Sequence, residues 1–207
     1  MKKLINVHIP DFNGKDLDEL LNQFSHPLRN HSRRVAICSS IMAEYAGQFL
    51  RSADSHAGSS LATIAHTGGT CHDVGKLLMP TLKANESDYL RHPEMSAELL
   101  ERYTDTLFSN PNQTQMILDI VRYHHERPDG SGFPNGLHTK DIPLLAGICA
   151  VANELDHRLY ENKELAPDVF NEMKSLKRSA FCETALVCME KAWPRLTEQY
   201  VEWGTIK

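Results

Sequence analysis

The sequence predicts an all-α protein, a compact helical bundle that carries one long irregular loop. Apolar residues recur at three- and four-residue steps through most of the 207-residue chain, and no alternating strand pattern of any length competes. Glycine and proline gather in one stretch, residues 127–141. Because 41% of the residues are hydrophobic, the chain can bury a sizeable core. We expect an N-terminal extension or short helix over residues 1–26 and a single domain over 27–207.

The first long helix is predicted by an apolar stripe with His31 at its head, which places this imidazole on the inward face. The stripe consists of His31, Val35, Cys38, Met42, Tyr45 and Phe49. The polar stretch 54–60 interrupts it, as a loop or a fresh helix start. Residues 61–72 resume the helical pattern, and Gly75 closes it.

Proline positions predict where the later helices begin. His92-Pro93 has the form of a helix entrance, with Pro93 at the first helical position and the helix continuing over 94–103. Residues 109–112 form a predicted turn. Further helices are expected over 113–125 and 143–160, from Pro167-Asp168 onward, and over 181–193. Three glycines and two prolines make 127–141 too irregular for a regular element.

Composition excludes several classes of protein. The net charge is −5 and no basic run stands out, which argues against a nucleic-acid polymer as partner. No apolar run reaches the roughly 18 residues of a membrane span, and the start is a poor signal peptide. We therefore expect a cytoplasmic protein without a membrane partner. The five cysteines form no CxxC pair, and most fall in helix-like stretches, so we expect buried, reduced thiols.

Histidines paired with acids carry the chemistry. His72-Asp73 lies in CHDVGK, His124-His125 lies in YHHERPDGSGFPNGL, and His31 and His92 stand alone. Imidazole is a common ligand for borderline metals, and a carboxylate such as Asp73 can bridge two cations. This combination is what a two-metal hydrolase needs.

Each position also has a structural explanation when it is taken alone. His31 would more often be a satisfied core histidine, and His92 could cap a helix. Neighbours on a helix point about 100° apart, so His124 and His125 can share one metal only near a helix end. Together the four sites favour metal binding.

Five segments, in order, resemble the HD-GYP domain of the HD phosphohydrolase superfamily, in a variant with GFP in place of GYP. The segments are HSRRV, HDVGK, HPEMSAELL, HHERPDGSGFPNGL and IPLLAGICAVANELD, over about residues 27–160. The resemblance implies a helical bundle of the HD type and a bacterial phosphodiesterase that opens cyclic di-GMP to pGpG or GMP. It also implies two divalent ions, with iron or manganese favoured and zinc or nickel as alternatives.

The resemblance assigns roles by matching position. The first metal would be held by His31, His72, Asp73 and Asn153, and the second by Asp73, His92, His124 and His125. Lys76 would lie beside the scissile phosphate, with Asp73 as the second catalytic residue. The motif or substrate-binding loop would contain Asp129, Gly132, Phe133 and Pro134.

Three positions depart from the family pattern. Phe133 replaces the motif tyrosine, so its ring can pack but offers no hydroxyl. Pro27 replaces a glutamate of three-metal members, which argues against a third ion. Asn153 replaces an aspartate, and its neutral amide should bind the first metal less tightly. Asp156 shares a helix face with Asn153 and either compensates as a ligand or has a structural role.

The phosphate-binding cations of the family are not recognisable after the last motif. Arg158 or Lys163 could substitute, although their spacing does not match. Arg33 and Arg34 either face a phosphate or lie on a solvated helix face, and the solvated face is the more common situation.

Three functions remain open on this basis. The first is a metal-dependent phosphodiesterase for a cyclic dinucleotide. The second is a degenerate module that binds a nucleotide or a signalling protein without catalysis. The third is a phosphohydrolase of another nucleotide. A second copy of the chain is a further candidate partner.

Overall fold

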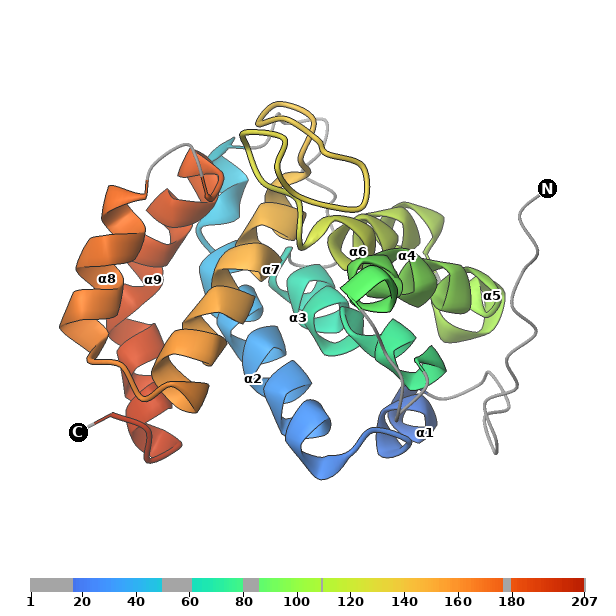
Figure 1. Cartoon of the computed structure of the whole chain (residues 1–207), viewed down its shortest axis with the longest axis horizontal. Helices are drawn as coiled ribbons and strands as arrows, with labels where there is room; N and C mark the ends of the chain where they lie inside the picture. The colour runs from blue at the N-terminus through green and yellow to red at the C-terminus, as the bar shows by residue number, and fades with distance from the viewer. Residues whose placement is uncertain (1–16, 50–60, 80–85, 109, 177–179, 207) are drawn as a thin grey trace.

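The computed structural model describes residues 17–49, 61–79, 86–108, 110–176 and 180–206, and these residues form helices joined by loops (Figure 1). Over these ranges there is no strand longer than an isolated bridge, so the all-α prediction is confirmed. The α-helices are α1 (Leu17–Asn22), α2 (His26–Ala43), α3 (Leu61–Cys71), α4 (Glu86–Glu101), α5 (Thr104–Leu107), α6 (Pro111–Tyr123), α7 (Leu144–Leu155), α8 (Ala166–Ser175) and α9 (Glu183–Glu202). The short segments are η1 (Ala46–Phe49), η2 (Val74–Leu78) and the π-helical η3 (Asp156–Glu161).

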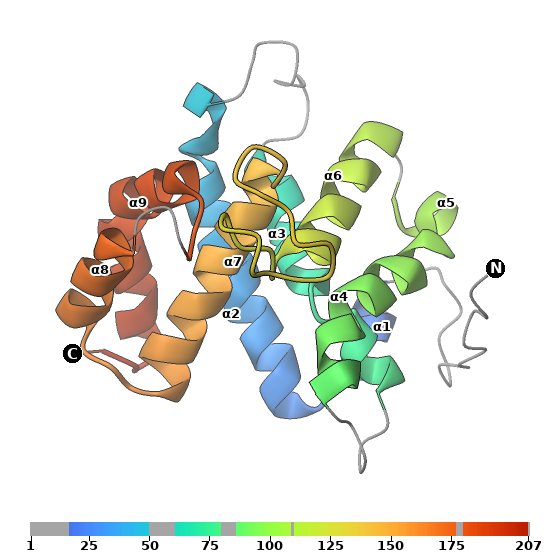
Figure 2. The same ribbon diagram turned by 45° about the horizontal axis from the view of Figure 1, so that its top comes forward.

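Helices α2, α3 and α7 lie at the centre of the bundle. Helices α8 and α9 cover one side and α4, α5 and α6 the other, and the irregular loop 127–141 lies at one end (Figures 1 and 2). Helix α2 packs against α3, α7 and α9, and α6 packs against α3, α4 and α7. The buried hydrophobic side chains form one cluster that runs from Leu20 to Tyr200.

Two glycines let α3 approach its neighbours closely. A Cβ added at Gly69 would lie 2.8 Å from Ala36 Cα of α2, and one at Gly68 would lie 2.6 Å from Ile120 Cδ1 of α6. Only residues without a side chain fit at such separations. Close packing therefore brings α3 against α2, which carries the predicted ligand His31, and α6, which ends just before His124.

The prediction that Pro93 begins a helix is wrong. Helix α4 starts at Glu86, and Pro93 lies in its interior. Proline removes one backbone hydrogen bond, but the Tyr89 carbonyl that loses its partner accepts a hydrogen bond from His92 Nδ1 at 2.5 Å. Helix α4 also packs against α6 and η2, which supports a continuous helix through the proline.

Other helix boundaries and one helix type also differ from prediction. Helix α6 begins at Pro111, inside the predicted turn, because the Asn110 side chain accepts hydrogen bonds from the next two free backbone N–H groups. The predicted helix 143–160 is helical but changes to π geometry at Asp156. Helix α9 continues beyond Trp193 to Glu202. The polar stretch 54–60 lies outside the described residues.

All five cysteines are free and buried, as predicted. Burial raises the pKa of the Cys38, Cys71 and Cys149 thiols to about 12. Among the described helices, none combines the length and the apolar character needed to cross a bilayer.

Candidate metal centre

Asp73 lies at the centre of a cluster of histidines and is buried, with 1% of its surface exposed. Its Oδ2 lies 3.3 Å from His72 Nε2 and 3.8 Å from His31 Nε2. Its Oδ1 lies 3.1 Å from His92 Nε2 and 4.0 Å from His124 Nε2. Each carboxylate oxygen therefore faces two imidazoles, and the four rings come from four separate segments of the chain.

Backbone carbonyls fix the rings of His72 and His124. His72 Nδ1 donates to the Gly69 carbonyl at 2.7 Å, and His124 Nδ1 donates to the Val121 carbonyl at 2.8 Å. A carbonyl can only accept, so the proton lies on Nδ1 and the Nε2 of each neutral ring is an acceptor. This is the arrangement in which histidine presents Nε2 to a metal.

His92 and His31 are oriented in the same sense. His92 Nδ1 donates to the Tyr89 carbonyl, and His31 Nδ1 lies 2.6 Å from Asp156 Oδ2. The Nε2 atoms of both rings thus also face Asp73 without a proton when the rings are neutral.

The converging atoms lack the partners that buried polar atoms normally have. The Nε2 atoms of all four histidines and Asp73 Oδ1 are buried without a hydrogen-bond partner. Acceptors 3–4 Å apart repel one another, and their desolvation is not repaid unless a cation lies between them. These residues therefore fit divalent metal ions. Among the described residues, three groups have ligand atoms within 4.8 Å of one another, and two of them belong to this cluster, namely His31, His72 and Asp73, and His92, His124 and His125. The third group is His31, Asp156 and Glu161.

Electrostatics prepare the histidines and the carboxylate for a cation. Burial lowers the pKa of His72, moves that of His124 well below its usual range, and lowers that of His125 to about 2. Burial alone would raise the pKa of Asp73, but His72 and the Lys76 ammonium outweigh it, so this pKa lies well below its usual range. At neutral pH the three imidazoles are neutral and the carboxylate is charged.

Lys76 lies on the solvent side of the carboxylate. Its Nζ is 2.6 Å from Asp73 Oδ2, and 27% of its side chain is exposed. It stands on η2, where a Cβ at Gly75 would lie 2.4 Å from the His92 carbonyl oxygen. This close contact with α4 fixes the segment that carries Lys76.

Asp156 orients His31. Its Oδ1 accepts from Arg34 Nε at 2.5 Å, and its Oδ2 accepts from Arg34 Nη2 at 2.9 Å and from His31 Nδ1. Both oxygens are engaged, which supports the structural role for Asp156. The solvated position considered for Arg34 is wrong, because Arg34 is buried against Asp156, whereas Arg33 is exposed.

Asn153 lies on α7, one turn before Asp156. Its side chain is buried, and its Oδ1 has no hydrogen-bond partner. A buried amide oxygen without a partner is what a weak oxygen ligand would show before an ion binds.

Two aromatic rings flank the exposed side of the cluster. Phe133 stacks on His125 with ring centroids 4.6 Å apart, so the ring without its hydroxyl still packs. Tyr89 is 43% exposed and lies 5.1 Å from His92 and 6.2 Å from Phe133, centroid to centroid. Sequence reasoning missed Tyr89. It stands three residues before His92 on one helix, and this spacing could have placed it on the same face.

Glu126 fixes the irregular loop 127–141, here called the signature loop, and was not assigned a role from the sequence. It is 2% exposed, and its two oxygens accept the backbone N–H groups of Asn135 and Leu137 at 2.7 and 2.8 Å. A Cβ at Gly132 would lie 2.2 Å from the Arg127 nitrogen, so only glycine fits there.

The remaining loop residues shape the backbone. Asp129 is exposed and accepts hydrogen bonds from the backbone and hydroxyl of Ser131. Pro134 is half-buried and follows a cis peptide bond from Phe133. Of the four predicted loop residues, Phe133 is the one whose ring contacts the histidine cluster.

The cations considered for phosphate binding are engaged elsewhere. Arg158 is paired with Glu164 and Glu172, each at 2.5 Å. The Lys163 ammonium lies 4.2 Å from the centre of the Tyr160 ring. Of Lys76, Arg158 and Lys163, Lys76 is the one whose charged group lies at the cluster.

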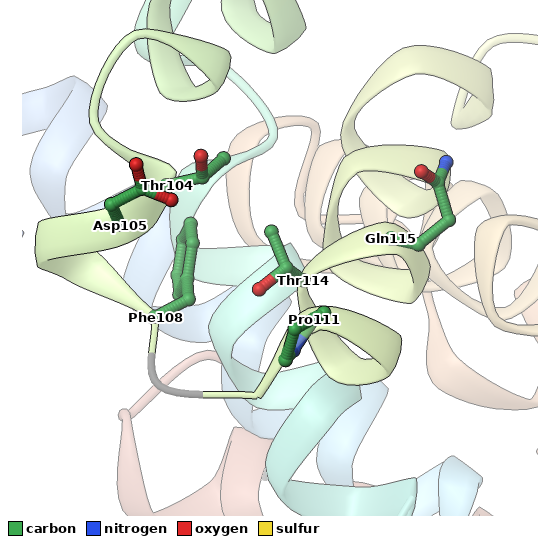
Figure 3. Close-up of a pocket in the computed structure, with 6 residues that line it drawn as sticks. All are labelled: Thr104, Asp105, Phe108, Pro111, Thr114 and Gln115. Carbon is green, nitrogen blue, oxygen red and sulfur yellow. The ribbon is translucent and has the colours of Figure 1, made fainter.

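A cavity of about 360 Å³ lies between α5 and α6, apart from the histidine cluster (Figure 3). It is lined by Thr104, Asp105, Phe108, Pro111, Thr114 and Gln115. Its one charged lining residue is acidic, which does not suit a phosphorylated ligand.

A helical bundle closed around histidines that converge on one buried aspartate defines the class of HD-type metal-centre domains. The HD domain family matches residues 28–158, and the chain therefore belongs to this family. The resemblance to its HD-GYP members is confirmed by the relatives.

Similar proteins include enzymes that act on cyclic dinucleotides. The chain is 28% identical over 195 residues to a cyclic di-GMP phosphodiesterase of Thermotoga maritima, covering 88% of this chain and 50% of that protein. It is 32% identical over 135 residues to 3'3'-cGAMP-specific phosphodiesterase 2 of Vibrio cholerae, covering 61% of this chain and 23% of that protein. The chain thus spans half or less of the length of these relatives.

A solved structure shares the fold. It is described as Bd1817, a HDG"Y"P protein from Bdellovibrio bacteriovorus, and it matches with a TM-score of 0.58 and 18% identity. The match covers 81% of this chain and 52% of that one.

Proposed function

We propose that the chain is a metal-dependent phosphodiesterase that hydrolyses a cyclic dinucleotide, with cyclic di-GMP as the first candidate and pGpG or GMP as product. The observation that carries this proposal is the set of buried, unpartnered Nε2 atoms grouped around the two oxygens of Asp73. The names of the relatives support the substrate class.

The proposed centre holds two divalent ions, with iron or manganese favoured. His31, His72, Asp73 and Asn153 would hold one ion, and Asp73, His92, His124 and His125 would hold the other. When bound, such ions supply Lewis acidity toward phosphate oxygens and lower the pKa of water. The neutral imidazoles and charged Asp73 described above suit this role.

Lys76 is the proposed electrostatic and proton-transfer residue. Its ammonium lies on the exposed side of Asp73, where a phosphate approaching the centre would meet it. There it would neutralise charge that develops on the phosphate oxygens and give a proton to the departing ribose oxygen as the phosphorus–oxygen bond breaks.

The aromatic rings at the mouth support a substrate with planar bases. Tyr89 and Phe133 lie on the exposed side of the centre, and nucleobases stack on such rings. We expect Tyr89 to contribute to the Michaelis constant for the dinucleotide more than to the chemical step.

Metal content and turnover test the proposal together. The purified chain, reconstituted with Mn²⁺ or Fe²⁺ and given cyclic di-GMP, should release pGpG or GMP. Substitutions D73N and H124A should abolish turnover and lower the metal content. H66A is a matched control, because His66 is exposed on α3 and outside the cluster. Bound metal without hydrolysis under any ion would contradict the catalytic function.

A module that binds without catalysis is the second candidate, favoured by Asn153 and Phe133 where the family pattern differs. It predicts that D73N leaves nucleotide or partner binding intact. A phosphohydrolase for another nucleotide is the third candidate. A panel that includes cyclic GMP-AMP, linear dinucleotides and nucleoside monophosphates separates it from the first.

A further inference from the structure

We propose that Pro93 is a positioning residue of the metal centre, because the backbone N–H that it lacks leaves the Tyr89 carbonyl free to fix the His92 ring. The inference rests on the proposed metal-dependent function and adds to it a residue that binds neither ion nor substrate.

Three histidines at the centre follow one geometric rule, in which Nδ1 donates to the carbonyl three residues earlier. For His72 and His124 that carbonyl is available without further adjustment. Gly69 and Val121 lie among the last four residues of α3 and α6, and the last four carbonyls of a helix have no partner within it.

His92 follows the same rule in the middle of a helix, where carbonyls are normally occupied. In α4 the Tyr89 carbonyl would accept the N–H of residue 93. Residue 93 is proline, which has no N–H and whose ring crowds the carbonyl four residues earlier. The carbonyl therefore lacks its usual backbone donor from residue 93, and His92 Nδ1 donates to it at 2.5 Å.

This hydrogen bond determines which nitrogen His92 presents to Asp73. With Nδ1 bound to the carbonyl, the unprotonated Nε2 lies 3.1 Å from Asp73 Oδ1 and has no hydrogen-bond partner. Without it, the neutral ring could carry its proton on Nε2 and donate to the carboxylate, which would block the nitrogen that should bind the ion.

Proline is the least favourable residue in a helix interior, so the substitution Pro93→Ala should have opposite effects on fold and centre. The restored N–H bonds the Tyr89 carbonyl. The thermal midpoint of the metal-free protein should rise. Metal affinity should fall by about 10- to 100-fold, the usual effect of losing a partner that orients a ligand.

The experiment compares P93A and P93G with P194A, in which Pro194 is an exposed proline inside α9. Mn²⁺ titration calorimetry should show one weakened binding step in P93A and P93G, and unchanged binding in P194A. Thermal midpoints should rise in P93A and P194A and less in P93G, because glycine is a poor helix former. In metal-free protein, ¹⁵N shifts of histidine should show His92 with its proton on Nδ1, and a mixture of tautomers in P93A.

Unchanged Mn²⁺ affinity together with an unchanged His92 tautomer in P93A would overturn the proposal. A metal defect of equal size in P194A would also contradict it. If the natural chain bound no Mn²⁺, the proposed function would fail, and the tautomer comparison would still show whether Pro93 sets the His92 ring.

Discussion

At the residue scale, Asn153 is the proposed ligand of the first ion that carries an amide where the family pattern has a carboxylate. Replacing Asn153 by Asp adds a carboxylate where a buried amide oxygen has no partner. We expect Mn²⁺ to bind the first site about tenfold or more tightly, the scale of changes around metal ligands. The metal-free protein should become less stable, because a buried charge is then added near a carboxylate.

Titration calorimetry and thermal unfolding measure the two effects of N153D. The control is N112D, at an exposed position in the first turn of α6. If N153D bound Mn²⁺ no more tightly than the natural chain, or if N112D gained as much affinity as N153D, Asn153 would not be a ligand of the ion.

His125 should make the stability of the metal-free protein depend on pH. The pKa of His125 is about 2 in the folded protein and near 6.5 in the unfolded chain, so the unfolded chain binds more protons between these values. Stability should therefore fall as pH drops below 6.5, with a contribution from His125 of about 1.4 kcal/mol per pH unit. The free energy of unfolding, measured with urea between pH 7.5 and 5, should depend less steeply on pH in H125Q than in the natural chain. An identical slope in the variant would contradict this assignment.

At the element scale, the sequence predicted the helices correctly where the local apolar pattern agrees with the packing. The apolar stripe from His31 to Met42 falls in α2, and Pro167 lies in the first turn of α8 as expected. Pro93 was misplaced because helical pattern does not show that a side chain can replace a backbone donor. The metal-ligand types followed from motif, but the link from Arg34 through Asp156 to His31 joins residues more than 120 positions apart.

The signature loop depends on one carboxylate, and this gives a graded prediction. Glu126→Gln should keep one acceptor and cost about 1–2 kcal/mol of unfolding free energy. Glu126→Ala should cost about 3 kcal/mol or more, because hydrogen bonds to a charged group contribute about 1.5–3 kcal/mol each. Urea unfolding measures both, with E198Q at an exposed residue of α9 as comparison. Equal losses in both Glu126 variants would argue against two separate hydrogen bonds.

At the scale of the whole molecule, the proposed centre joins residues of α2, α4 and α7 and of the segments that follow α3 and α6, so an ion bound there should stabilise the entire bundle. Binding only to the folded state adds about 2.7 kcal/mol when free metal is 100 times its dissociation constant. We expect the thermal midpoint to rise with Mn²⁺ and to fall again with a chelator. The thermal midpoint of D73N should change little when Mn²⁺ or a chelator is added. A midpoint in the natural chain that does not respond to metal would contradict a shared centre.

The buried thiols have a consequence for how the metal-free protein reacts with oxidants. Sulfur binds metals as thiolate, and burial raises the pKa of two thiols to about 12, those of Cys71, beside His72, and Cys149, one turn from Asn153. Both thiols are therefore protonated at neutral pH. In the metal-free protein these thiols are therefore weak nucleophiles, and we expect them to react slowly with mild oxidants.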